Sequence, residues 1–162
     1  VEDGIVTLSP RPGEKGWQRY DAYLTTKETY RNFVLDLEFK FAPEGNSGVF
    51  LRVGDLADHV TSGFEIQILD THGLAKPGHH DGGGIIRTAA PFENRMKPAG
   101  EWNRYQFVLM DSTLVVYLNG GLIQALDLSK SAVADRPMRG HISLQDEAKV
   151  VSYRNIRIKE LN

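Results

Sequence analysis

The stretch from residue 45 to residue 70 combines strand-like alternation with side chains that take part in acid–base and sugar chemistry. In its first half Phe50 and Arg52 are two residues apart, so they are expected on one face of a strand. In its second half Glu65 and Gln67 share a face, while isoleucines alternate with them. If the two strands pair, a carboxyl, an amide and a guanidinium meet on one sheet face. We therefore predict the candidate site here.

Asp70 adds a second acid to this stretch, five residues after Glu65. Five is odd, so both acids share a face only if a bulge lies between them. The Glu-x-Gln-x-x-Asp pattern resembles the catalytic strand of laminarinase-type endoglucanases, with Gln67 in place of the central acid. Retaining glycosidases hold two carboxyl groups about 5–5.5 Å apart, close to the roughly 6.6 Å between same-face strand neighbours. The alternative is a solvated sheet face, on which Arg52 forms a surface ion pair.

The remaining residue types exclude several kinds of functional site. The five histidines show no regular ligand spacing, so no cofactor is predicted with certainty and a divalent cation is left open. The chain has no cysteine, which excludes disulfides and thiolate nucleophiles. It also lacks a Gly-x-Ser-x-Gly turn and a P-loop. Trp17 and Trp102 are candidates for stacking on sugar rings, but Trp102 begins an alternating strand and is expected in the core or at its edge.

Length and charge narrow the class of partner. The 162 residues predict a single domain, residues 1–162. Nineteen basic and 21 acidic residues leave a net charge of -2, so we predict no nucleic-acid partner. No apolar run reaches the roughly 20 residues of a membrane span, which predicts no membrane insertion. A neutral small ligand fits best. Because the sequence starts abruptly in strand-like residues, we expect that a leader segment precedes residue 1.

Short alternating stretches predict an all-β fold. Residues 33–41 give the strongest strand, and further strands are predicted over 102–110, 113–118, 122–126 and 141–145. Asn119-Gly120 is the signature of a type I′ turn. In the last strand, residues 150–158, the apolar pattern changes phase, which predicts a bulge near Arg154-Asn155. Many strands with short turns and no helical period indicate a β-sandwich or barrel.

Six segments in order resemble the 3-keto-disaccharide hydrolase domain family, a bacterial family. They are residues 46–52, 64–70, 97–103, 118–120, 143–146 and 153–159. The resemblance covers nearly the whole chain. It implies a concanavalin A-like jelly-roll sandwich of two antiparallel sheets, secreted or periplasmic, that acts on saccharides oxidised at C3.

Such a substrate needs only one base. A ketone at C3 acidifies the proton on C2, so a base removes this proton, the aglycone leaves C1 by β-elimination, and water is added afterwards. On this resemblance Glu65 is the predicted base, Arg52 or a bound cation stabilises the enolate, and Gln67 and Gln145 orient hydroxyl groups. Asp70 completes the predicted catalytic set.

The sequence also departs from the family pattern near the predicted site. Glu147 stands where family members often carry a histidine, and Arg87 stands where they often carry a tyrosine. His80 lies in a loop that resembles the family's. We therefore add Phe50, His80, Arg87 and Glu147 to Gln67 and Gln145 as predicted substrate-binding residues. The alternative function is a non-catalytic carbohydrate-binding module. Because aromatic residues make up only 9% of the chain, the enzyme is preferred.

Overall fold

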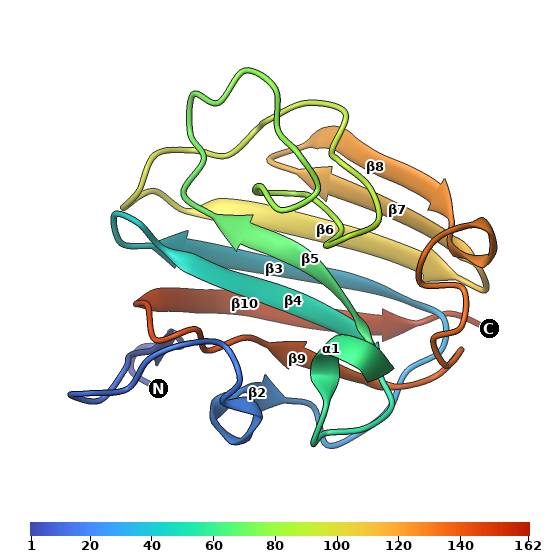
Figure 1. The fold of residues 1–162 in the computed structure, drawn as a ribbon, viewed down its shortest axis with the longest axis horizontal. Coiled ribbons are helices and arrows are strands. Elements are labelled where there is room, and N and C mark those ends of the chain that lie inside the picture. The colour runs from blue at the N-terminus through green and yellow to red at the C-terminus, as the bar shows by residue number, and fades with distance from the viewer.

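Ten strands form two sheets in a computed structural model that describes residues 1–162 (Figure 1). The strands are β1 (Val6–Leu8), β2 (Leu24–Thr25), β3 (Phe33–Phe41), β4 (Asn46–Val53), β5 (Phe64–Leu69), β6 (Asn103–Met110), β7 (Thr113–Leu118), β8 (Gly121–Asp127), β9 (His141–Leu144) and β10 (Val151–Glu160). Three helical turns are η1 (Tyr20–Ala22), α1 (His59–Ser62) and η2 (Leu128–Lys130). None of these helices is long and apolar enough to cross a membrane.

Both sheets are antiparallel. The larger has the strand order β1-β10-β3-β6-β7-β8, and the smaller has the order β2-β9-β4-β5. Twenty-five buried hydrophobic residues form the core cluster, to which both sheets contribute. On β3 every second residue from Phe33 to Phe41 is buried, because alternate side chains of a strand share a face. This architecture confirms the predicted jelly-roll sandwich.

Two local predictions are confirmed by the backbone. Asn119 and Gly120 have φ of 51° and 81°, the left-handed pair that a type I′ turn requires between β7 and β8. On β10 the register with β3 shifts between Arg154 and Arg157, and Asn155 has φ of 52°. The extra residue at this bulge moves the apolar pattern by one position.

A second bulge, on β4, corrects the predicted facing of Arg52. The register of β4 with β9 shifts between Phe50 and Val53, and Arg52 has φ of 56°. Val53 therefore packs beside Phe50 and Tyr23 on the outer face of the smaller sheet. The side chain of Arg52 turns to the other face. The prediction that Phe50 and Arg52 share a face is wrong, because the bulge changes the alternation between them.

Candidate functional site

The candidate site lies on the outer face of the smaller sheet, where a loop covers the edge strand β5. Figure 1 shows this loop beside β5. The amide of Gln67 donates to the carbonyl of Gly84 at 2.9 Å, and the amide of Ile86 donates to the carbonyl of Glu65 at 3.0 Å. A Cβ on Gly84 would lie 2.6 Å from the carbonyl oxygen of His79, so this close approach requires glycine. This loop, which pairs with β5, brings His80, Ile86 and Arg87 to the site.

A cleft of about 360 Å³ opens between this loop and the sheet, and we call it the main cleft. It gathers six of the nine predicted site residues, namely Glu65, Gln67, His80, Arg87, Gln145 and Glu147. The other lining residues are Trp17, Asn46, Val60, Leu69 and Ile86. The cleft therefore joins residues that are up to 130 positions apart in the sequence, from Trp17 to Glu147.

Glu65 is a buried acid in the wall of the main cleft, with 9% of its surface exposed. Its carboxyl group occupies the space beside Gly48 of β4, where any Cβ would collide with it. Burial, followed by the nearby carboxyl group of Glu147, raises the pKa of Glu65 to about 8. At neutral pH this carboxyl group is therefore mostly protonated, and a modest rise in pH turns it into a base.

The side-chain amide of Gln145 connects the two carboxyl groups. Oriented to satisfy its neighbours, its nitrogen donates to Glu65 Oε1 at 3.1 Å and to Glu147 Oε2 at 3.2 Å. Its oxygen lies 3.1 Å from the hydroxyl group of Tyr23, which donates to it. Burial also raises the pKa of Glu147, against the opposing effect of Lys149. The amide thus fixes two acids with raised pKa values in one cleft.

Aromatic side chains pack beside this polar group, and of these only Phe50 was predicted as a site residue. The ring centroid of Tyr23 lies 5.8 Å from that of Phe50 and 4.9 Å from that of His59. Tyr20 stacks on His59 at 5.0 Å. Tyr23 was not predicted as a site residue, because the short segment β2 that follows it shows only weak alternation. Its burial next to a glutamine becomes visible only once β9 lies beside β2.

Gln67 and His80 line the cleft in a structural pairing. Gln67 Nε2 lies 3.4 Å from the carbonyl oxygen of His80, and Gln67 Oε1 accepts from the amide of Ile68 at 3.2 Å. The hydroxyl group of Tyr105 donates to the carbonyl of Gln67 at 2.7 Å. Hydrogen bonds therefore hold both the backbone and the side chain of Gln67, and its side-chain amide lines the cleft in a defined position.

Three predicted residues lie outside the main cleft. Arg52, 3% exposed, donates to the carbonyl oxygen of Asp111 and lies 3.6 Å from the sulfur of Met138. Asp70 accepts from the amide of Glu44 at 3.1 Å and so closes the turn between β3 and β4. Phe50 lines a smaller neighbouring cavity. The structure therefore does not bring Arg52 and Asp70 together with Glu65.

The donor set does not fit a bound metal ion. No group of three or more histidine, aspartate or glutamate side chains lies in an arrangement that could hold one. The main cleft offers the carboxyl pair of Glu65 and Glu147, with Gln145 donating its amide protons to both. Protons directed at both carboxyl groups compete with a cation for the same oxygens.

The fold and sequence are similar to those of known carbohydrate-related proteins. A 3-keto-disaccharide hydrolase of Bacteroides thetaiotaomicron is 22% identical over 202 residues, which cover 100% of this chain and 70% of that protein. The crystal structure of a candidate glycosyl hydrolase from Parabacteroides distasonis is 28% identical, with a TM-score of 0.83 over 98% of this chain and 88% of that one.

A carbohydrate-binding module from Bacillus subtilis, CBM66, shares the fold at 12% identity, with a TM-score of 0.63 over 97% of this chain and 96% of that one. A family model described as the 3-keto-alpha-glucoside-1,2-lyase-like domain matches residues 1–159. This match spans every strand but the end of β10 and all residues of the main cleft. The chain therefore belongs to the 3-keto-alpha-glucoside-1,2-lyase-like domain family.

Proposed function

We propose that this protein cleaves 3-keto-glycosides and that Glu65 is the base that removes the C2 proton. The observation that carries this proposal is the burial of Glu65 in the wall of a sugar-sized cleft, with a pKa raised to about 8. A buried acid with a strongly shifted pKa in a cleft is typical of an acid–base catalyst. The family match supports the substrate class.

The reaction needs one proton transfer and one bond cleavage in the first stage. The ionised Glu65 takes the proton from C2, and the electrons of this C–H bond form the C1–C2 double bond. The bond from C1 to the glycosidic oxygen breaks, and the departing oxygen takes up a proton from water in the cleft. The products are an enone and the free aglycone. The hydroxide that this water leaves then adds to C1, and the proton held by Glu65 returns to C2, which completes a net hydrolysis and restores the ionised Glu65.

Arg87 takes the role of anion stabiliser in this proposal. Its side chain lines the main cleft and makes no ion pair with an acidic residue. A guanidinium group without an acidic partner is available for the oxygen that becomes negative when C2 loses its proton. Arg52 was the predicted stabiliser, but the structure places it against Asp111 instead.

A carbohydrate-binding module is the second candidate function. Trp17 lines the main cleft and keeps 37% of its surface exposed, so it offers a face for stacking on a sugar ring. A binding module needs no acid with a raised pKa, however, and keeping Glu65 buried costs stability at high pH. Glu65 therefore favours the enzyme.

The proposal is tested with a panel of α- and β-linked 3-keto-glucosides, each with and without a chelator. We expect release of the aglycone together with enone absorbance, and no release from the unoxidised glucosides. Because the donor set does not fit a metal ion, activity should persist with the chelator. Saturable binding of the saccharides without release of any aglycone would instead support the binding module.

A further inference from the structure

A second, smaller cavity adjoins the main cleft, and we call it the side cavity. Its volume is about 220 Å³. Four residues line both spaces, namely Val60, Glu65, Ile86 and Arg87. The carboxyl-bearing side chain of Glu65 therefore borders the two spaces, and a ligand that crosses from one into the other passes Glu65.

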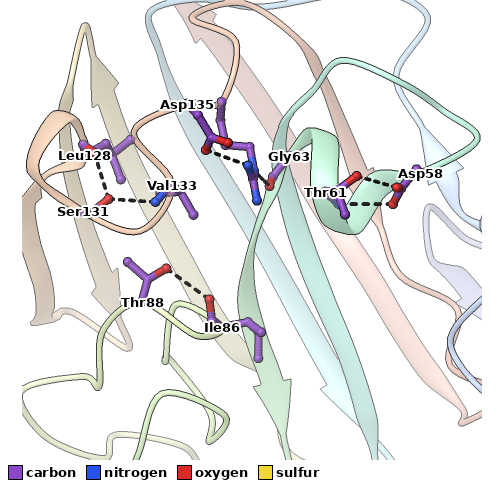
Figure 2. A network of polar contacts seen from close by, with 10 residues as sticks. Asp58, Thr61, Gly63, Ile86, Thr88, Leu128, Ser131, Val133 and Asp135 are labelled. Carbon is purple, nitrogen blue, oxygen red and sulfur yellow. Dashed lines mark hydrogen bonds and ion pairs between the residues drawn. The ribbon is translucent and has the colours of Figure 1, made fainter.

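The loop from residue 131 to residue 137 forms one wall of the side cavity. Arg136 fixes this loop to the start of β5, because its Nε donates to the carbonyl of Gly63 at 2.7 Å. Within the loop the amide of Val133 donates to the hydroxyl group of Ser131 at 3.3 Å. Figure 2 shows Gly63, Val133, Thr88 and Ile86, which all line the side cavity. The wall is thus held in place by hydrogen bonds before any ligand arrives.

More hydrophobic side chains line the side cavity than line the main cleft. Six of its 11 lining residues are hydrophobic, compared with four of 11 in the main cleft. Phe50 and Phe64 contribute from the sheet, and Val133 contributes from the loop. A dry cavity of about 150 Å³ already accepts benzene, so the side cavity has room for one substituted aromatic ring. Two of its polar side chains, Thr88 and Arg136, already donate to the carbonyl groups of Ile86 and Gly63, so they are less available to sugar hydroxyl groups.

From this arrangement we propose that the side cavity is the leaving-group subsite and that it selects substrates with an apolar, planar aglycone. The inference rests on the proposed function. When C2 of the oxidised sugar lies at Glu65 in the main cleft, C1 is one bond away, at the boundary between the two spaces. The substituent on C1 then extends into the side cavity. An aryl group would bury apolar surface there that a second sugar would not.

The test compares a 4-nitrophenyl 3-keto-glucoside with a methyl 3-keto-glucoside, whose one-carbon aglycone leaves the side cavity empty. Ala132 is exposed and lines the side cavity, so Ala132→Trp fills the cavity without disturbing the core. Ala134 is exposed in the same loop but does not line it, so Ala134→Trp is the matched control. We expect A132W to raise the ratio of the aryl KM to the methyl KM by about tenfold or more, because the ring loses its apolar contacts. A134W should leave this ratio unchanged.

The outcomes separate this inference from the proposed function. If both glucosides are cleaved and A132W leaves the KM ratio as in A134W, the subsite assignment is wrong and the proposed function stands. If neither glucoside is cleaved, both proposals are wrong. Thermal melting of both variants checks that each is folded. A variant with Ala132→Phe repeats the test with a smaller ring if the tryptophan lowers the melting temperature.

Discussion

The outer faces of the two sheets carry similar patterns of polar residues, but they shift the pKa values of their acids in opposite directions. On β3 of the larger sheet, Asp36 alternates with core residues and accepts from Arg104 Nε at 2.8 Å. That hydrogen bond holds the pKa of Asp36 below its usual value. On β5 of the smaller sheet, Glu65 also alternates with core residues, yet burial raises its pKa to about 8.

Coverage by loops explains the difference between the two faces. On the larger sheet, cations lie against the acidic and aromatic side chains. Arg154 lies 4.0 Å and Lys40 lies 5.0 Å from the ring centroid of Trp102. On the smaller sheet, residues of the segments 86–88 and 132–136 line the spaces beside Glu65, which keeps only 9% of its surface exposed. An acid that loses water without gaining a cation becomes a base of higher pKa. The loops, rather than the strand pattern, therefore make the site.

The largest expected effect comes from removing an acid on each face. Glu65→Gln keeps the shape of the side chain but cannot accept a proton, so we expect kcat on a 3-keto-glucoside to fall about 10²–10⁴-fold. Glu38→Gln makes the same change on the larger sheet, where Glu38 pairs with Arg154, and should leave kcat unchanged. Steady-state kinetics at pH 8 measures both. Full activity of E65Q would show that Glu65 is not the base.

The contributions of Glu65 and Asp36 to the stability of the fold should change with pH in opposite directions. Because folding raises the pKa of Glu65 from 4.5 to about 8, its contribution to stability is fully present below pH 4.5 and is lost as the pH rises toward 8. This loss amounts to at most about 1.4 kcal/mol per pH unit. E65Q should therefore gain stability over the wild type as the pH rises from 5 to 8 in urea denaturation.

Asp36 provides the opposite case and the control. Its lowered pKa contributes stability above its usual pKa of 3.8, and this contribution is lost as the pH falls below that value. Asp36→Asn should therefore leave the slope between pH 5 and pH 8 as in the wild type. A slope that is the same in E65Q and in the wild type would contradict the raised pKa of Glu65.

Gln145 tests whether the amide between the two acids supports catalysis. Gln145→Leu removes the donor to the ionised Glu65, and a hydrogen bond to a charged group is worth about 1.5–3 kcal/mol. We expect kcat/KM to fall about 10–100-fold and the pH at which activity rises to move upward. Gln106→Leu, on the outer face of β6, is the matched control. A loss of activity with an unchanged pH profile would argue for a merely structural role.

The strands and their turn chemistry could be predicted from the sequence, because they depend on local patterns. The bulge of β10 was visible as a phase change between Tyr153 and Ile156. The bulge of β4 was not, because Val49, Leu51 and Val53 keep an unbroken alternation across it. The bulge coincides with a contact between residues far apart in the sequence. Gly140 lies against the backbone of Arg52 so closely that no Cβ would fit. One missed bulge was enough to misplace Arg52.

The candidate site shows the same division. Glu65 and Gln67 follow from strand alternation, and Gln145 and Glu147 follow from the resemblance to the family, so these four residues were expected and the cleft unites them. Tyr23 and the wall around Val133 were not expected. They come from loops whose sequence has no period. Tyr23 reaches the site through its hydrogen bond to Gln145, just after β9, and the wall around Val133 through the hydrogen bond of Arg136 to Gly63, just before β5.

The smallest expected effect is on the larger sheet, where the polar residues are paired in solvent. Arg104→Ala removes the ion pair with Asp36, and a surface pair is worth about 0–1 kcal/mol. The free energy of unfolding should fall by no more than this, and kcat on a 3-keto-glucoside should not change. Urea denaturation in low and high salt measures the effect, which salt should reduce further. A loss of several kcal/mol would mean that this ion pair is not screened by solvent, and that loop coverage alone does not separate the two faces.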